Sequence, residues 1–262
     1  MRYADAPARR AALLQRLQAD GYVSSARFAD ELGVSEMTVR RDLKQLDAEG
    51  LVQRVAGGAS LPRFGHGAPF EERAVTREAE KRAIAAACLP LLEGSGTVLL
   101  DAGTTIAPLA AAVAAGTTVV SHSLPVLTAC AARDDVAVVA IGGEYQRDTR
   151  SFTGSTAREA LQAVSADVAV LSATALDATG LLCANPRDAE LKRAMSAVAV
   201  RRIVLADAAK LGARAPYRFG GLDAVDVLIT GPGADPELVA RLRASGIDVV
   251  IAAEAATLAA GR

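Results

Sequence analysis

From residue 97 onward, short runs rich in Val, Ile and Leu alternate with Ala-rich stretches that have helical spacing. A continuous apolar run predicts a strand that is buried on both faces. Strands that alternate with helices favour a parallel sheet with helices on each side. We therefore expect an open, Rossmann-like α/β domain. The predicted strands are residues 98–100, 118–121, 136–141, 168–171, 203–206, 227–230 and 249–251.

The first 62 residues carry a different pattern, in which three short helices follow one another closely. Gly33 stands directly after the second predicted helix, and Ser35 is placed to cap the third. Gly57 and Gly58 then separate two short apolar runs, as in a hairpin. Three helices and a hairpin wing indicate a winged helix-turn-helix domain. The predicted elements are helices over 9–17, 25–32 and 36–48 and strands over 51–55 and 59–61.

The predicted third helix separates an apolar stripe from a polar face. On a helical wheel Val39 and Leu43 fall together, while Arg41 and Lys44 fall on the opposite side. Such a helix suits a DNA major groove, where Arg can bond a guanine edge and Lys can neutralise phosphate; a solvated surface helix is the alternative. We expect Arg41 to contact a base and Arg40, at the flank, to contact phosphate. The candidate DNA-binding residues are Ser35, Met37, Thr38, Arg40, Arg41, Lys44, Arg54, Gly57 and Gly58.

A segment rich in Pro and Gly, residues 62–69, predicts a domain boundary. We expect a DNA-binding domain at 1–62, a linker at 63–70 and the α/β domain at 71–262, which begins with a charged helix over about 71–92. The whole chain has a net charge of −1, and residues 1–65 hold 10 Lys and Arg against 8 Asp and Glu. With so small a basic excess, binding of nucleic acid would depend on where the basic side chains lie.

The cysteines and histidines offer little for metal binding. Cys88, Cys130 and Cys183 are widely spaced in apolar surroundings, and the two histidines, His66 and His122, are far apart. This spacing predicts buried thiols and no zinc site, and we expect no cofactor. No apolar run approaches the roughly 18 residues of a membrane span, and no signal-peptide pattern is present. We therefore expect a cytoplasmic protein without a membrane partner.

Polar residues follow several predicted strands at the point where each strand ends. The loop from Asp101 to Thr105 comes after a strand and before a helical stretch over 106–115, so its backbone N–H groups and hydroxyls could hold an anion. A tight turn capped by Thr is the alternative. Carboxyl ends of parallel strands share one edge of the sheet, where ligands usually bind. The candidate ligand-binding residues are Asp101, Gly103, Thr104, Thr105, Ser121, His122, Ser123, Gly142, Gly143, Asp207 and Lys210, with Glu190 and Lys192 from a later helix.

Several of these segments resemble the signature of DeoR-type bacterial repressors. The resemblance implies operator DNA as a partner of the N-terminal domain, and a C-terminal domain that senses a phosphorylated sugar. It also implies repression of carbohydrate catabolism genes, and we expect a homodimer or homotetramer. Gly231 departs from the family, which often has an acidic residue there. The segments are 34–43 (VSEMTVRRDL), Leu46, 49–51 (EGL), 54–59 (RVAGGA), 80–81 (EK), 101–105 (DAGTT), 142–143 (GG) and 207–210 (DAAK).

A sugar-phosphate isomerase is the alternative function. The C-terminal half also resembles the ribose-5-phosphate isomerase fold, a group of isomerase- and CoA-transferase-like α/β domains. Those isomerases carry an Asp-Gly-Ala-Asp segment for acid–base work, whereas residues 172–175 read Ser-Ala-Thr-Ala. Without two carboxyl groups the chain has no evident machinery to move protons, so we expect binding without catalysis and predict no catalytic residue. The sequence favours a nicotinamide site even less, because Gly94 and Gly96 precede their strand instead of following it.

Overall fold

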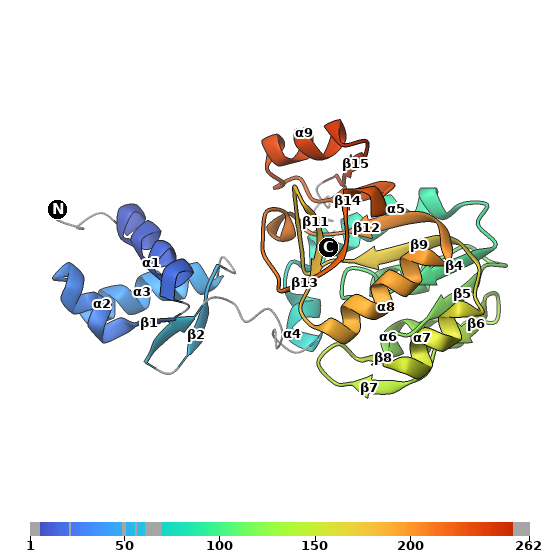
Figure 1. The fold of residues 1–262 in the computed structure, drawn as a ribbon, viewed down its shortest axis with the longest axis horizontal. Coiled ribbons are helices and arrows are strands. Elements are labelled where there is room, and N and C mark those ends of the chain that lie inside the picture. Colours follow the sequence, from blue (N-terminus) through green and yellow to red (C-terminus); the bar gives the residue numbers. More distant parts are fainter. Residues whose placement is uncertain (1–5, 21, 49–50, 56, 61–69, 254–262) are drawn as a thin grey trace, which may run out of the picture. The chain divides into compact units, whose positions relative to one another are not determined.

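The computed structural model describes residues 6–20, 22–48, 51–55, 57–60 and 70–253 (Figure 1). The chain divides into two compact units, Met1–Arg63 and Phe64–Arg262, hereafter unit 1 and unit 2. Most of the predicted linker lies outside the described residues. Phe70, expected at its end, instead begins a helix and is buried. No helix in the described part of the chain is long and apolar enough to span a membrane.

Unit 1 combines three helices with a small antiparallel sheet. Gly33 adopts a left-handed conformation (φ 63°) and ends α2, as its position in the sequence predicts. Leu13, Leu17, Phe28 and Val39 lie in one apolar core. The two later helices have the predicted bounds, whereas the first strand was not predicted. The elements are α1 (Ala6–Asp20), β1 (Tyr22–Ser24), α2 (Ser25–Leu32), α3 (Glu36–Ala48), β2 (Gln53–Val55) and β3 (Gly58–Ser60), with sheet order β1-β3-β2.

Unit 2 is built on a parallel sheet that has seven strands in the described residues, in the order β15-β14-β12-β9-β4-β5-β6. Every run predicted as a strand from its continuous apolar character forms one of these strands. The strands are β4 (Thr97–Leu100), β5 (Thr118–Ser121), β6 (Ala137–Ala140), β9 (Ala166–Ser172), β12 (Ala199–Leu205), β14 (Val227–Thr230) and β15 (Asp248–Ile251). Because all run in the same direction, their carboxyl ends meet at one edge.

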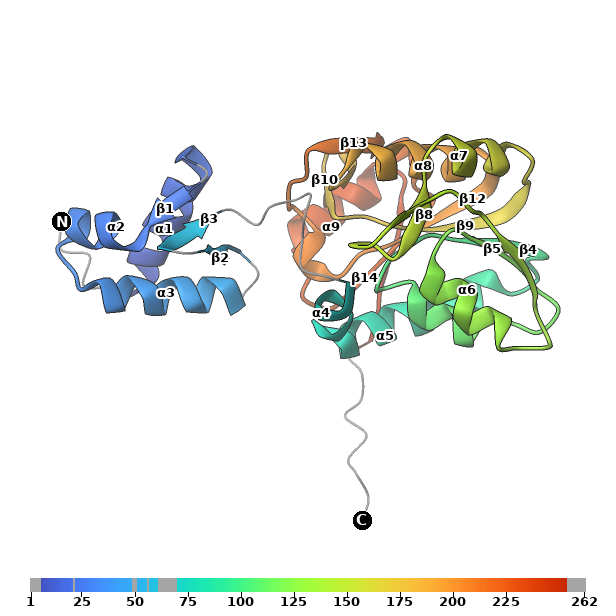
Figure 2. The same cartoon turned by 90° about the horizontal axis from the view of Figure 1, so that it is seen from below.

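Helices cover both faces of this sheet, as the sequence predicts (Figure 2). On one face α7 (Ser155–Gln162), α8 (Pro186–Ala197) and α9 (Pro236–Ala244) bury Leu161, Leu191 and Leu238. On the other face α5 (Glu78–Cys88), α6 (Leu124–Ala131) and the 3-10 helix η2 (Ala107–Ala111) bury Ile84, Val126 and Leu109. The sheet is thus the middle layer of a three-layer sandwich.

Two predicted helices differ from the structure. The charged helix expected over 71–92 is interrupted, because Arg77 has a positive φ of 54° and separates α4 (Phe70–Val75) from α5. After Cys88 the chain tightens into a 3-10 helix, η1 (Leu89–Leu92), which contains Pro90. The stretch expected as a helix over 106–115 forms only the five-residue η2, which also begins next to a proline.

Short strands and 3-10 helices complete unit 2 and were not predicted. β7 (Glu144–Gln146) and β8 (Ser151–Thr153) form a hairpin. β10 (Ala175–Asp177), β11 (Gly180–Cys183) and β13 (Tyr217–Gly220) form a separate sheet, and η3 (Ala208–Lys210) and η4 (Leu222–Ala224) lie in the loops after β12 and β13.

Candidate functional site

The outward face of α3 carries most of the predicted DNA-binding side chains. Val39, Leu43 and Leu46 are at most 2% exposed and pack in the core of unit 1. The division between the buried and exposed faces is therefore the one that the helical wheel predicts. The exposed side chains are those of Met37, Arg40, Arg41, Lys44 and Gln45, with Met37 68% exposed.

The first turn of α3 is fixed by a hydroxyl pair. Ser35 Oγ accepts a hydrogen bond from the backbone N–H of Thr38 at 3.1 Å, and the two side-chain hydroxyls lie 2.8 Å apart. Ser35 is thus the N-cap of α3, as predicted. The two hydroxyls are hydrogen-bonded to each other, so a contact of either hydroxyl with DNA would compete with that hydrogen bond.

The two adjacent arginines of α3 differ in their surroundings. Arg40 forms an ion pair with Glu36 one turn earlier, with Nη2 to Oε1 at 2.8 Å. Arg41 and Lys44 form no ion pair with any other described residue. Arg40 is therefore partly neutralised, whereas Arg41 and Lys44 have no such partner among the described residues.

A buried ion pair holds α3 against α1. The guanidinium of Arg9 contacts both carboxylate oxygens of Asp42, with Nη2 to Oδ1 at 3.2 Å, and both side chains are buried. Arg10 donates to Gln45 Oε1 at 2.6 Å on the same side. Sequence reasoning missed this pair, although Asp42 lies beside the apolar stripe on the helical wheel. The pair sets the orientation of the exposed face.

The two glycines of the wing have different roles. Gly57, with φ +81°, forms the turn, and its carbonyl accepts from the N–H of Ser25 at 2.9 Å. Gly58 is a buried residue of β3, where a Cβ atom would lie 2.0 Å from Val23 O. The expectation that both glycines form the hairpin turn is therefore wrong for Gly58, which is needed for close strand packing. Arg54 is exposed on β2.

In unit 2, Asp101 is the centre of a buried cluster at the carboxyl ends of β4, β5 and β9. Its Oδ2 accepts from the backbone N–H and the hydroxyl of Ser172, each at 2.8 Å, and from the ammonium of Lys192. Burial alone raises the pKa of Asp101, but Lys192 and His122 outweigh it and hold that pKa well below its ordinary value. Asp101 is thus a fully buried carboxylate.

Lys192 reaches this cluster from α8. Its ammonium contacts Ser172 Oγ at 3.2 Å and lies 3.8 Å from Asp188 Oδ1 and 5.6 Å from the centre of the Phe219 ring. Burial lowers the pKa of Lys192, but the carboxylates of Asp101 and Asp188 raise it by more. The pKa of Lys192 therefore lies above its ordinary value. Lys192 is therefore a buried, charged group held by Asp101 and Ser172.

His122 connects the cluster to the β7–β8 hairpin. A carbonyl oxygen can only accept, so Nδ1 carries a proton that it donates to Phe152 O at 2.9 Å. Nε2 lies 3.0 Å from Asp101 Oδ1 and 3.2 Å from Ala102 N. Ser121 and Ser123 have local bonds, because Ser121 Oγ donates to Leu100 O and Ser123 caps α6.

The loop over 101–105 differs from the predicted anion cradle. It opens only the 3-10 helix η2, so the helix dipole that was expected to attract an anion is largely missing. Gly103 backs onto Ser172, where a Cβ atom would lie 2.8 Å from both Cβ and Oγ. Thr104 and Thr105 are buried, and Thr105 Oγ1 has no hydrogen-bond partner in the described residues.

Asp207 and Lys210 lie at the same edge of the sheet, next to α5. Lys210 Nζ is 3.4 Å from Asp207 Oδ2, and Glu80 Oε1 accepts from the N–H of Ala208 at 2.9 Å. A Cβ atom at Gly231 would lie 2.0 Å from Glu80 Oε1. The glycine at this position therefore leaves the space that the Glu80 side chain fills.

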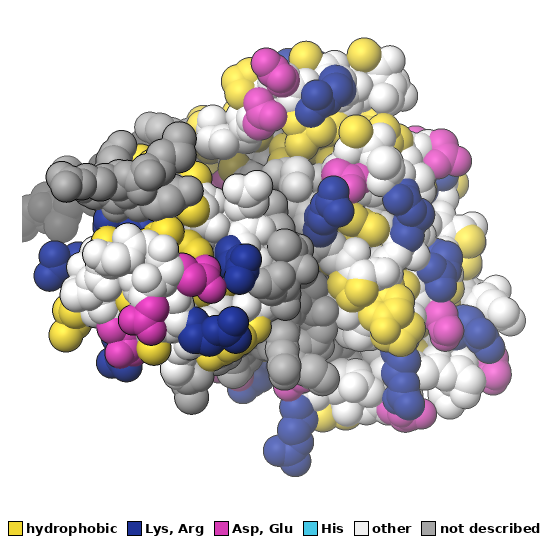
Figure 3. Space-filling view, turned by 60° about the vertical axis from the view of Figure 1, so that its left-hand side comes forward, with side chains coloured by type: hydrophobic (Ala, Val, Ile, Leu, Met, Phe, Trp, Pro, Cys, Tyr) yellow, Lys and Arg dark blue, Asp and Glu magenta, His cyan; other side chains and the backbone are white. Residues whose placement is uncertain are grey.

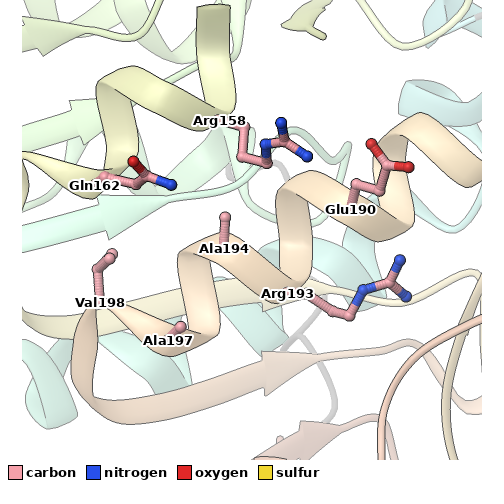
Figure 4. Close-up of a pocket in the computed structure, with 7 residues that line it drawn as sticks. All are labelled: Arg158, Gln162, Glu190, Arg193, Ala194, Ala197 and Val198. Carbon is pink, nitrogen blue, oxygen red and sulfur yellow. The ribbon is translucent and has the colours of Figure 1, made fainter. Parts of the chain in front are cut away.

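Glu190 does not join the cluster. It is exposed on α8, away from buried Lys192, and lines an open groove of about 510 Å³ between α7 and α8 (Figure 4). Glu190 and Lys192 therefore lie on different faces of α8, and the part of Glu190 in ligand binding stays a prediction. The other residues of the groove are Arg158, Gln162, Arg193, Ala194, Ala197 and Val198.

Gly142 and Gly143 lie after β6, at the predicted edge. Gly143 has φ +143°, and a Cβ atom there would lie 2.4 Å from Thr153 O, so this glycine allows the chain to turn into β7. Both glycines are exposed. Their part in ligand binding stays a prediction.

Two residues of the cluster, Ser172 and Asp188, were missed as site residues from the sequence. Ser172 ends a buried strand, which is the same signal that identified Asp101. Burial raises the pKa of Asp188 by more than the positive charge of Lys192 lowers it, so this pKa lies above its ordinary value.

Among the described residues, no group of three or more His, Cys, Asp or Glu is placed to hold a metal ion. Cys88, Cys130 and Cys183 are buried free thiols.

The comparisons with known proteins cover both units. Residues 9–63 match the DeoR-like helix-turn-helix domain, and residues 76–232 match the DeoR C terminal sensor domain. The transcriptional repressor AccR of Agrobacterium fabrum is 32% identical over 230 residues, which cover 86% of this chain and 89% of the relative. The HTH-type transcriptional regulator GlpR of Haloferax volcanii is 31% identical over 226 residues, which cover 85% and 89%. Ribose 5 phosphate isomerase A from Neisseria gonorrhoeae is 15% identical with a TM-score of 0.35, covering 51% of this chain and 53% of that one.

A helix-turn-helix unit followed by a parallel α/β unit defines a two-domain DNA-binding regulator with a sensor domain. The chain belongs to the DeoR family of transcriptional regulators.

Proposed function

We propose that this protein represses genes of carbohydrate catabolism by binding operator DNA through α3, and that a phosphorylated sugar bound to unit 2 releases it. The observation that carries the DNA-binding part is the exposed face of α3, where Arg41 and Lys44 have no ion-pair partner in the described chain. On the face drawn in Figure 3, basic and acidic side chains are interspersed. DNA binding would therefore depend on the positions of particular basic side chains more than on the net charge of the protein.

The base contact of Arg41 can be tested directly. Selection from random duplexes gives the operator, and fluorescence anisotropy then measures its affinity. We expect Arg41→Ala to weaken binding by about 1 to 3 kcal/mol, because a bidentate contact to guanine is lost. Arg241→Ala, on the exposed surface of α9, is the matched control and should bind like the unchanged protein. Full affinity in a folded Arg41→Ala variant would contradict the assignment.

The sensing part of the proposal is supported by the polar and basic groups at the carboxyl ends of the strands of unit 2, which is where α/β folds usually bind ligands. A thermal-shift screen of phosphorylated sugars tests it. A ligand at 100 times its dissociation constant should stabilise the protein by about 2.7 kcal/mol. If no phosphorylated sugar shifts the unfolding temperature, the sensing part fails.

We also propose that the protein acts as a homodimer or homotetramer. Paired α3 helices would then contact half-sites roughly 10 base pairs apart, or a multiple of that spacing. Light scattering of the free protein and of its operator complex measures the number of chains. A single chain on the operator would contradict this part.

The isomerase alternative has no specific observation in its favour. Its acid–base segment would follow β9, where residues 172–175 are Ser, Ala, Thr and Ala. Ser172 bonds Asp101 and Lys192, and it has no carboxyl group to move protons between sugar carbons. Incubation with ribose 5-phosphate decides the matter, since turnover above background would favour the enzyme.

A further inference from the structure

The outer face of α8 carries two opposite charges that have no ion-pair partner within the described part of the chain. Glu190 and Arg193 are both exposed on this helix, and neither forms an ion pair with another described residue. Arg193 Nη1 donates to the backbone oxygen of Arg218 at 2.7 Å, which leaves other N–H groups of the guanidinium for a further contact. The contrast is Arg187 of the same helix, which is paired with Glu144.

The neighbouring helix α7 carries a second set of charges of both signs. Arg158 and Glu159 are exposed, and neither forms an ion pair with another described residue. Arg158 lines the groove from α7, while Glu190 and Arg193 line it from α8 (Figure 4). The two helices together therefore present two positive and two negative side chains that the described chain leaves without opposite charges.

Apolar side chains form the rest of this face. Ala194, Ala197 and Val198 line the groove between the charged residues. Val200, two residues after Val198, is 79% exposed. Because side chains alternate along a strand, Val200 lies on the same side of β12 as Val204, which packs in the core on the face that α8 covers. Covering these apolar groups would remove their surface from water, and the small alanine side chains would let a second helix approach closely.

The spacing of the charges on α8 fits a second copy of the same surface. Glu190 and Arg193 are three residues apart, so they are neighbours on one side of the helix. If two copies of α8 meet in antiparallel orientation about a two-fold axis between these residues, each Glu190 lies opposite Arg193 of the other copy. A partner that carries charge of one sign would be repelled by either Glu190 or Arg193, whereas a second copy of the chain satisfies both.

We propose that the outer face of α7 and α8 is a contact between two copies of this chain. This inference rests on the homo-oligomer of the proposed function, and it names the surface through which two chains associate. The apolar groups of the groove are covered at the centre of the contact. Ion pairs between Glu190 of one copy and Arg193 of the other set the antiparallel orientation of the two α8 helices.

Charge reversal tests this contact. Sedimentation equilibrium of the full chain over a range of concentrations gives the dissociation constant for the association of chains. We expect Glu190→Arg to raise this constant by about tenfold or more, because the two-fold axis places like charges against each other twice. Arg193→Glu should have the same effect. The double variant Glu190→Arg, Arg193→Glu exchanges the two charges and should recover most of the association, which a variant that had only disturbed the fold would not do.

Arg241→Glu is the matched control, since Arg241 is exposed on α9, and it should associate like the unchanged protein. If the chains associate but both single reversals leave the dissociation constant unchanged, this contact is overturned and the oligomer forms through another surface. A double variant that associates as weakly as the single variants would also overturn the contact. If the unchanged protein stays a single chain at every concentration, the proposed oligomer fails together with the contact, so the two failures are distinguishable.

Discussion

Asp42 neutralises the buried guanidinium of Arg9 and so fixes the face that α3 exposes. We expect Asp42→Ala to destabilise unit 1 by about 3 kcal/mol, because it leaves a buried cation with fewer partners. Hydrogen exchange of residues 36–48 in the full chain measures the effect. Asp47→Ala is the control, since Asp47 lies on the same helix and is exposed. Unchanged exchange of α3 in Asp42→Ala would contradict this role.

The elements of this protein were predictable where the sequence carries its own boundary signals. Ser35 and Gly33 cap their helices, and the bounds of α2 and α3 were predicted to the residue. The seven strands of the parallel sheet were predictable because each lies in an apolar run, although β6, at one edge of the sheet, has no buried residue. The strands that were missed are three or four residues long, too short to show a period. The break at Arg77 was missed because no glycine or proline marks it.

Of the residues in the Asp101 cluster, those that stand at the ends of strands were the predictable ones. Asp101 and His122 stand directly after strands, so the shared edge of a parallel sheet brings them together. Lys192 was placed near Asp101 only loosely, because its contact joins residues 91 positions apart and depends on which face of α8 packs inward. The same uncertainty applies to Glu190, which lies on the exposed face of α8.

Gly58 sets the spacing of the wing. A Cβ atom at this position would lie 2.0 Å from the backbone oxygen of Val23, and backbone atoms cannot move aside without separating β1 from β3. We expect Gly58→Ala to destabilise unit 1 by about 2 to 4 kcal/mol and to weaken operator binding. Gly142→Ala is the control, because nothing lies within 4 Å of its added Cβ. A Gly58→Ala variant with the stability of the unchanged protein would show that the strands have room.

At the scale of the whole molecule, sensing and DNA binding must be thermodynamically linked if the proposed function holds. An effector that weakens operator affinity by some factor must itself be bound more weakly, by the same factor, when operator is present. The sugar phosphate found by the thermal-shift screen should therefore show two dissociation constants in calorimetry, one with operator and one without. Their ratio should equal the ratio of operator affinities measured by anisotropy with and without the ligand. Equal effector affinity in the presence and absence of operator would mean that unit 2 binds its ligand without controlling α3.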